Sequence, residues 1–180
     1  MRRSLIALGL VAALALTAHA DTKYALTGDN TKVTFTGKKP DGKHTGGFKK
    51  LTGTVTVPEG GDLTKLAIAV DIDTDSLYSD DEKLTGHLKN ADFFDVKNQP
   101  KATFKSTKVE KTTTGYTVTG ELTMLGKAKA VSFPATITEK DGTLTVAATF
   151  AIDRTQWGMN YGKGKIDDKV DLGLEVSAKK

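Results

Sequence analysis

From residue 21 onward, apolar and polar side chains alternate with a period of two. The alternation is clearest over residues 66–72, 131–137, 144–152 and 170–176. Period two is typical of β-strands with one dry face and one wet face. The wet positions are rich in threonine, whose branched β-carbon suits a pleated strand. No long helical repeat interrupts this pattern, so the sequence predicts an all-β protein.

Glycine and aspartate separate the alternating runs at residues 58–61, 114–115 and 141–142. Such short connections join antiparallel neighbours. About eight strands with one apolar face each can close into a barrel or stack as a sandwich, and the alternation leaves both open. A barrel of eight strands holds packed side chains or one small ligand.

The segment from Ser79 to Asp95 departs from the alternation. Ser79 and Glu82 have the spacing of a capping box, which predicts a short helix near residues 80–90 with Ser79 as its N-cap. Phe93 and Phe94 follow it, and two adjacent phenylalanines cannot both face inward on one strand. We therefore expect a corner that closes one opening of the fold as a lid.

The first twenty residues have the organisation of a secretory signal peptide. Arg2 and Arg3 precede an apolar run from Leu5 to Leu16, and Ala20 ends a segment of small residues. The run is too short to span a bilayer. We expect cleavage after Ala20, export to the periplasm or the medium, and one mature domain over residues 21–180 that does not span the membrane.

The charge pattern argues against a nucleic-acid partner. The formal net charge of +4 includes Arg2 and Arg3, so the predicted mature chain carries only +2. Its lysines are scattered among acidic residues, whereas a nucleic-acid surface has a basic stripe with stacking aromatic residues.

Catalytic and metal-binding patterns are weak. The chain has no cysteine and no Gly-x-Ser-x-Gly elbow. Asp71, Asp73 and Asp75 alternate as calcium ligands could, but the sixth position of that loop is a serine where an EF-hand has glycine. His44 and His87 alone are too few to define a metal site. No catalytic residue and no resident cofactor are predicted.

Residues 87–107 carry the most specific motif, which includes His87-Leu88-Lys89 and Asp92-Phe93-Phe94-Asp95. Three further regions agree with it along the chain. They are Gly46-Gly47-Phe48 with Gly53, Gly120-Glu121-Leu122-Thr123 with Gly126 and Val131, and Arg154-Thr155-Gln156-Trp157-Gly158-Met159. In these motifs the chain resembles the YceI-like family of exported bacterial proteins.

The resemblance implies a lipocalin-like extended antiparallel β-barrel with a long apolar channel, and no catalytic activity. Members of the family hold a polyisoprenoid chain, such as an isoprenoid quinone or a polyprenyl phosphate, or fatty amides. Some are homodimers, although no stripe here marks an interface. The chain departs from the family's usual form at residues 40–44 and in the turn of residues 125–128.

A long-chain lipid is therefore the expected ligand. The candidate channel lining comprises Phe35, Phe48, Leu66, Ile68, Val70, Leu88, Phe93, Phe94, Phe104, Leu122, Met124, Phe133, Ile137 and Phe150. The candidates for holding a polar head group are His87, Arg154 and Trp157, since arginine suits a phosphate and the tryptophan N–H can donate to a quinone carbonyl. Two alternatives stay open. One is a ligand-free stress or interaction module with a filled core. The other is an integral outer-membrane barrel, which the threonine and lysine of the wet face disfavour.

Overall fold

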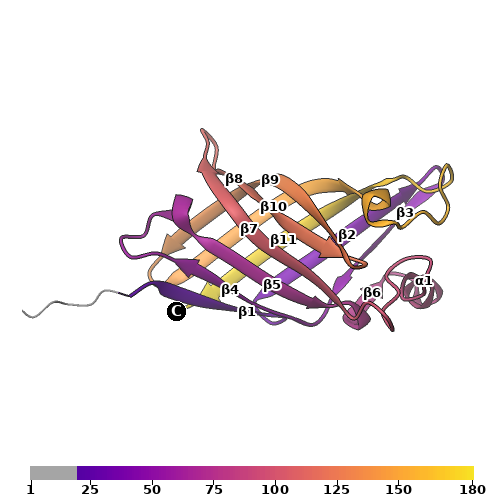
Figure 1. The fold of residues 1–180 in the computed structure, drawn as a ribbon, viewed down its shortest axis with the longest axis horizontal. Coiled ribbons are helices and arrows are strands. Elements are labelled where there is room, and N and C mark those ends of the chain that lie inside the picture. The colour runs from indigo at the N-terminus through magenta and orange to yellow at the C-terminus, as the bar shows by residue number, and fades with distance from the viewer. Residues whose placement is uncertain (1–19) are drawn as a thin grey trace, which may run out of the picture.

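The structure is a computed structural model, and it describes residues 20–180. The predicted signal peptide, residues 1–20, lies outside the described residues except for Ala20. The described chain folds into a strongly curved antiparallel sheet with one short α-helix at one end (Figure 1). Its elements, in chain order, are β1 (Thr22–Thr27), β2 (Thr31–Lys39), β3 (Gly42–Phe48), β4 (Leu51–Val57), η1 (Leu63–Lys65), β5 (Ala67–Asp73), η2 (Thr74–Ser76), β6 (Leu77–Ser79), α1 (Glu82–Leu88), β7 (Lys101–Lys111), β8 (Tyr116–Met124), β9 (Lys127–Lys140), β10 (Thr143–Asp153), η3 (Arg154–Trp157) and β11 (Lys169–Lys179).

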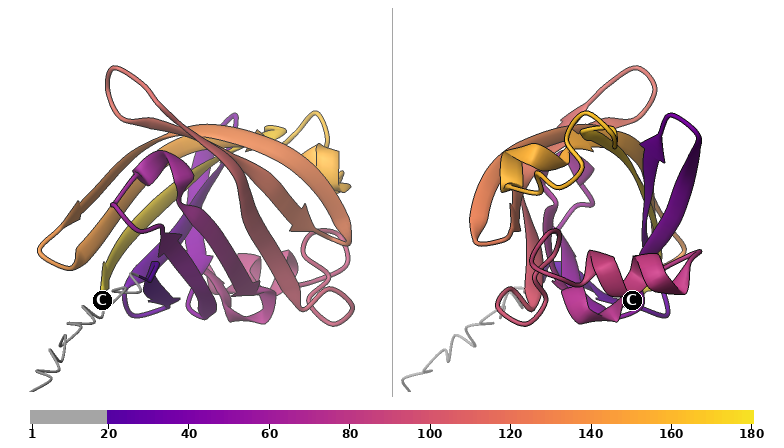
Figure 2. Two further views of the ribbon diagram at one scale, coloured as in Figure 1. Left: turned by 60° about the vertical axis from the view of Figure 1, so that its left-hand side comes forward. Right: turned by 90° about the vertical axis from the view of Figure 1, so that its right-hand side faces the viewer.

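The sheet curls round until its two ends meet. Its strand order is β1-β4-β5-β7-β8-β9-β10-β11-β2-β3-β6, and every named pair is antiparallel. β3 continues directly into β4, and β5 continues into β6 through η2. β4 and β5 lie near one edge of the sheet and β3 and β6 at the other, so these two connections close the sheet on itself. The result is a lipocalin-like barrel, as the sequence predicts, and Figure 2 shows its curved walls from two sides.

The strand count differs from the expected eight for a physical reason. β3 continues into β4 in one direction along the wall. β2 pairs antiparallel with β3, and β1 pairs antiparallel with β4, so β1 and β2 also share one direction. A turn at residues 28–30 divides them. Three pairs of short strands thus form three long runs, and with the five remaining strands they make eight.

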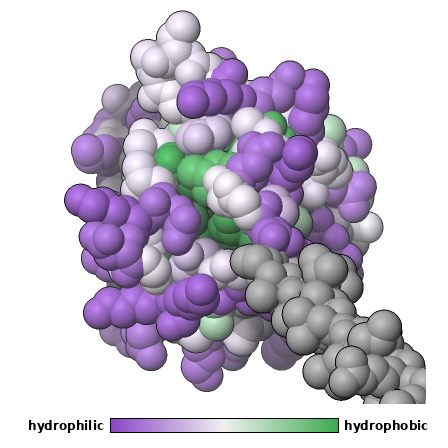
Figure 3. All heavy atoms as spheres, turned by 90° about the vertical axis from the view of Figure 1, so that its left-hand side faces the viewer, coloured by the Kyte–Doolittle hydropathy of each residue, from purple (hydrophilic) through white to green (hydrophobic). Residues whose placement is uncertain are grey.

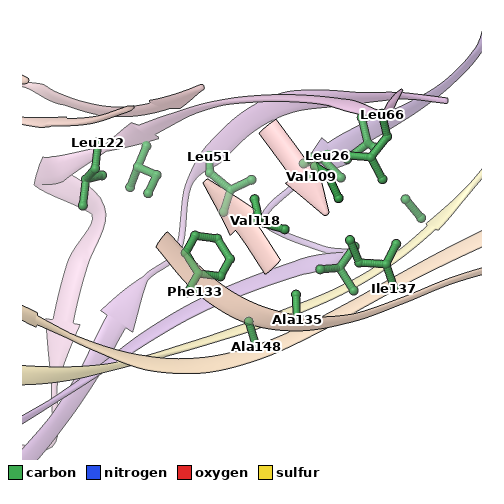
Figure 4. Close-up of a cluster of buried hydrophobic side chains, with 14 of the residues drawn as sticks. Leu26, Leu51, Leu66, Val109, Val118, Leu122, Phe133, Ala135, Ile137 and Ala148 are labelled. Carbon is green, nitrogen blue, oxygen red and sulfur yellow. The ribbon is translucent and has the colours of Figure 1, made fainter. Parts of the chain in front are cut away.

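The predicted stripes meet in register around the wall. Phe150 on β10 lies opposite Leu172 on β11, and Leu172 lies opposite Phe35 on β2. Directly opposed residues of an antiparallel pair share one face of the sheet. Figure 4 shows the buried side chains of several strands pointing into this common interior. Closing one apolar face on itself buries it from water, which is the main stabilisation of such a fold.

β9 changes its partner half-way along its length. Residues 127–135 pair with β8, whereas residues 136–140 pair with β10. Pro134 lies at the change, and proline has no N–H to donate to a second neighbour. The pairing of β9 with β10 therefore ends before Phe133, although the Phe133 and Phe150 rings still stack side by side, with their centroids 4.2 Å apart.

The N-cap of α1 corrects the sequence prediction. The capping side chain is that of Asp81, which accepts a hydrogen bond from the Leu84 N–H at 2.7 Å, and α1 ends at Leu88 instead of near Asn90. Ser79 cannot cap the helix, because it is the last residue of β6 and pairs with Gly46 of β3. The Ser79 hydroxyl instead donates to the Asp81 carbonyl at 2.7 Å.

The two ends of the barrel differ. At the end shown in Figure 3, apolar residues lie on the floor of a recess that polar residues surround. Near this end, where β1 begins, Tyr24 is fully buried and its hydroxyl donates to Glu139 on β9 at 2.7 Å. At the other end, α1 and the segment after η3 lie on opposite sides of the rim (Figure 2). This second end is called the mouth below.

Candidate ligand-binding cavity

The barrel encloses a cavity of about 250 Å³. Its walls come from every strand except β6, and α1 with the following corner contributes Leu84, Leu88, Phe93 and Phe94. The chain has seven phenylalanines, and all seven line this cavity. Few polar groups border it, which is typical of a site for an apolar ligand.

The phenylalanine rings form two groups inside the cavity. Phe104, Phe133 and Phe150 make a row through the middle, with centroid distances of 5.7 Å and 4.2 Å. Near the mouth, Phe48 contacts both Phe35 at 6.2 Å and Phe94 at 5.5 Å. Each group brings together rings from different segments of the chain, so the aromatic lining depends on the tertiary fold.

Two glycines give these rings room against the wall. A Cβ built on Gly46 would lie 2.4 Å from the Phe35 ring, and one built on Gly120 would lie 2.5 Å from the Phe104 ring. Both rings therefore occupy space beside a glycine that a side chain at that position would fill. This packing helps to leave the space that the cavity occupies.

The structure brings most of the predicted lining residues together. Leu66 and Ile137 are the exceptions, because both lie in the buried core outside the cavity lining. The residues that do border the cavity are Phe35, Phe48, Ile68, Val70, Leu88, Phe93, Phe94, Phe104, Leu122, Met124, Phe133 and Phe150. The prediction omitted Val33, Leu172, Leu174 and Val176, although their stripes were visible in the sequence. Contact of any of these residues with a ligand stays a prediction.

Arg154 borders the cavity, but its guanidinium is used within the protein. The side chain is 4% exposed. Its Nε donates to the Asp167 carbonyl, one terminal nitrogen donates to the carbonyls of Met159 and Tyr161, and the other donates to the Ile166 carbonyl. These bonds fold residues 159–167 around one cation.

Trp157 does not line the cavity. Its indole is 1% exposed, and the indole N–H donates to the Leu122 carbonyl on β8 at 3.0 Å. The side chain thereby fastens η3 to the barrel wall. A ligand would reach this N–H only by displacing that bond.

His87 lies at the mouth on α1, outside the cavity lining. Its Nε2 lies 3.1 Å from Asp92, and its ring packs edge-on against Phe93 and Tyr161, at centroid distances of 5.1 Å and 4.7 Å. Tyr161 belongs to the segment that Arg154 organises. The His87 ring therefore joins the two segments at the rim of the mouth.

The only titratable side chains that border the cavity are basic, among the residues that the structure describes. They are Lys38, Lys39, His44 and Arg154, and no aspartate or glutamate belongs to the lining. The first three lie on the β2–β3 hairpin. The sequence singled out His44 only as a weak metal candidate and did not indicate the lysines, because nothing local shows that this hairpin borders the mouth.

The candidate calcium ligands serve structural roles. Asp73 caps η2 by accepting the Asp75 N–H at 3.0 Å. Asp71 lies 3.4 Å from the Lys101 ammonium, and Asp75 lies 3.1 Å from that of Lys89. Within residues 20–180, no group of three or more histidine, cysteine or acidic side chains is placed to hold a metal ion.

Comparison with known families matches residues 24–178 to the model described as the YceI-like domain. The chain belongs to the YceI-like family. The UPF0312 protein of Pseudomonas putida strain GB-1 is 36% identical over 123 residues, which span 63% of this chain and 62% of that protein. A UPF0312 protein of Vibrio parahaemolyticus is 34% identical over 143 residues, 75% of this chain and 74% of that protein.

Solved structures share the same fold. BcnA of Burkholderia cenocepacia superposes with a TM-score of 0.76 at 27% identity, over 83% of this chain and 96% of that one. A polyisoprenoid binding domain from Saccharophagus degradans, implicated in plant cell wall breakdown, superposes with a TM-score of 0.68 at 13% identity, over 87% and 97%. The YceI-like fold is therefore common to all three. Within residues 20–180, none of the helices has the length and apolar character needed to cross a membrane.

Proposed function

We propose that this YceI-like protein is an exported lipid-binding protein that carries or scavenges an isoprenoid or similar long-chain amphiphile in its barrel. The observation that carries the proposal is the cavity of about 250 Å³ bordered by every phenylalanine of the chain. A smaller engineered cavity, of about 150 Å³, stays dry and binds benzene. The name of the Saccharophagus degradans domain, a polyisoprenoid binding domain, supports the same class of ligand.

The energetics of an apolar chain are sufficient for this function. Each buried methylene contributes about 0.8 kcal/mol, so some fifteen carbons contribute on the order of 12 kcal/mol. Association and ordering cost about 4 kcal/mol or more. The remainder is at most about 8 kcal/mol, which corresponds to a Kd of about 1 µM or weaker. A polar head group is not needed for binding, and a binding role requires no catalytic residue.

Export is part of the proposal. It is supported by the signal-like organisation of residues 1–20, with two arginines followed by an apolar run. We place the mature protein in the periplasm or outside the cell. Amino-terminal sequencing of protein recovered from these fractions tests this, with Asp21 as the expected first residue.

The binding proposal is tested with the protein from its own host. Organic extraction followed by mass spectrometry should yield a long-chain lipid in stoichiometric amount. Delipidated protein titrated with farnesol should show a saturable change in the fluorescence of Trp157, the single tryptophan. Absence of lipid in the extract together with absence of a saturable response would refute the proposal.

A matched pair of variants locates the site. Val70 lines the cavity, whereas Ala69 is exposed on the outer face of the same strand. Val70→Phe should fill the cavity and weaken farnesol binding at least tenfold. Ala69→Phe adds the same ring outside and should leave the Kd unchanged. If both variants changed the farnesol Kd equally, farnesol would bind outside the cavity.

A further inference from the structure

The β2–β3 hairpin combines an apolar face with basic side chains at the mouth. Phe35 on β2 lines the cavity, and strand alternation places Gly37 and Lys39 on the same face. His44 lies opposite Gly37 in the register of the hairpin and so shares that face. The inner face of the hairpin therefore passes from a phenylalanine ring to two basic groups as it leaves the barrel.

The His44 ring is held in place and has one nitrogen to spare. Its Nδ1 lies 3.0 Å from Asp80, whose other carboxylate oxygen accepts the Thr45 N–H at 2.9 Å. The Thr45 N–H and then His44 lower the pKa of Asp80, so this carboxylate is ionised at neutral pH. Among the described residues, His44 Nε2 makes no hydrogen bond. The imidazole is thus anchored through one nitrogen while the other is left for a ligand.

Lys39 is equally available. Its ammonium lies 3.6 Å from Asp41, and the two side chains are 42% and 79% exposed. Exposed ion pairs of this kind contribute little free energy, so Lys39 can exchange Asp41 for another anion at small cost. Lys38 also borders the cavity, but alternation turns its side chain toward the outer face, where the ammonium lies 2.7 Å from Asp171.

We infer that Lys39 and His44 bind the anionic head group, a phosphate or a carboxylate, of the amphiphile whose tail occupies the cavity. The inference rests on the proposed function. It deepens that function by selecting anionic amphiphiles over neutral ones of the same tail. The lack of any acidic side chain in the described cavity lining supports this selection, since a carboxylate there would repel such a head group.

Arg154 does not compete for this role. Loop carbonyls accept four hydrogen bonds from its guanidinium, and Asp168 Oδ1 lies 3.5 Å from one terminal nitrogen as an ion-pair partner without a hydrogen bond. Lys39 offers its ammonium, and His44 offers an Nε2–H donor in its doubly protonated imidazolium form, in which Nδ1–H still donates to Asp80. Neither group has to break a buried bond to do so. The head-group site thus lies on the hairpin where this chain departs from the usual form of the family.

The experiment compares probes with the same tail and different head groups. Delipidated protein is titrated with farnesol, farnesyl phosphate and farnesoic acid, at low salt and at 0.5 M NaCl (about a 4 Å Debye length). Farnesyl phosphate or farnesoic acid should bind about tenfold more tightly than farnesol at low salt, and the advantage should shrink at high salt. The relative affinities of the phosphate and the carboxylate decide which anion the site prefers.

The double variant Lys39→Gln with His44→Gln should remove this advantage, so that the three probes bind with similar Kd values. Lys43→Gln is the matched control, because Lys43 is exposed on the same hairpin but lies outside the lining. The control removes a charge from the same region without touching the site, so its Kd values should equal those of the wild type.

The outcomes separate the two proposals. If farnesol binds as tightly as the anionic probes, or if Lys43→Gln weakens anion binding as much as the double variant, the head-group site is refuted while lipid binding stands. If none of the three probes binds, the proposed function fails and the head-group site fails with it.

Discussion

Tyr24 is a phenol buried at the end of the barrel opposite the mouth, and its single polar contact is with a carboxylate. Burial first, and then the hydrogen bond to Glu139, raise the pKa of Tyr24 to about 12 from 10.0. In the unfolded chain the hydroxyl loses its proton near pH 10. The protonated Tyr24 hydroxyl therefore makes its full contribution to the free energy of unfolding below about pH 10. This contribution is lost as the pH rises toward about 12.

Tyr24→Phe should lower the free energy of unfolding by about 1 kcal/mol at neutral pH, because one hydrogen bond is lost. The difference between wild type and variant should then narrow between about pH 10 and pH 12, since only the wild type has a proton to lose at this site. Urea unfolding of both proteins across this pH range measures the difference in their free energies of unfolding. The many lysines titrate in both proteins, so a difference that stays constant would contradict the assignment.

Arg154 shows what a residue-scale argument from sequence can miss. The Arg-x-x-Trp-Gly motif was visible, but the sequence does not show where the carbonyls of residues 159–167 come to lie. The chemistry that suits arginine to a phosphate also suits it to a cluster of carbonyl oxygens. Only the folded loop distinguishes the two, and in the structure the carbonyls hold the guanidinium.

Arg154→Met should destabilise the protein by about 2–4 kcal/mol, because several carbonyls lose a charged donor and stay partly buried. Arg154→Lys keeps the charge but not the planar fork, and should recover less than half of the loss. Thermal or urea unfolding of the three proteins measures the effect. A loss below about 0.5 kcal/mol in Arg154→Met would show that the loop does not depend on this side chain.

At the scale of elements, the alternation predicted most strands and their inner faces, because burial of one face imposes period two. It did not predict that β9 changes partners at Pro134, since both halves of the strand alternate in the same way. It also misplaced the N-cap of α1. Asp80 is drawn to His44 and Thr45, and Ser79 is held in β6, so the helix can begin only after Asp81.

The cap gives a prediction for α1. Asp81→Ala should cost the helix about 1 kcal/mol, because the Leu84 N–H loses its acceptor. Asp81→Ser should keep most of the cap. Hydrogen exchange measures the change at the Leu84 amide, which should exchange about fivefold faster in the alanine variant, while amides of β10 and β11 keep their rates. Equal acceleration throughout the barrel would mean that α1 does not open locally.

At the scale of the whole molecule, a shared apolar interior follows from the apolar stripes, whereas the choice of a barrel over a sandwich and the cavity do not. The stripes require a shared interior, but whether side chains fill it depends on how rings lie against the wall. Gly46 and Gly120 decide this for Phe35 and Phe104, and no periodicity shows that a glycine on one strand faces a ring on the next. The family resemblance, which suggested a channel, supplied what the pattern could not.

The whole-molecule prediction concerns ligand and stability together. A ligand that binds only the folded state should raise the free energy of unfolding by about 2.7 kcal/mol at one hundred times its Kd. Farnesol should therefore raise the melting temperature of delipidated wild type and of Ala69→Phe, but not of Val70→Phe. Scanning calorimetry with and without the probe measures it. An equal rise in Val70→Phe would exclude the cavity as the cause.

The concentration of all seven phenylalanines in the cavity lining has a spectroscopic consequence. Biosynthetic replacement of phenylalanine by a fluorinated analogue would put every fluorine nucleus of the protein beside the cavity. A fluorine NMR spectrum would then contain signals from the site alone, without background from the rest of the barrel. The rings near the mouth and the row around Phe133 would report separately on how deeply a bound chain reaches.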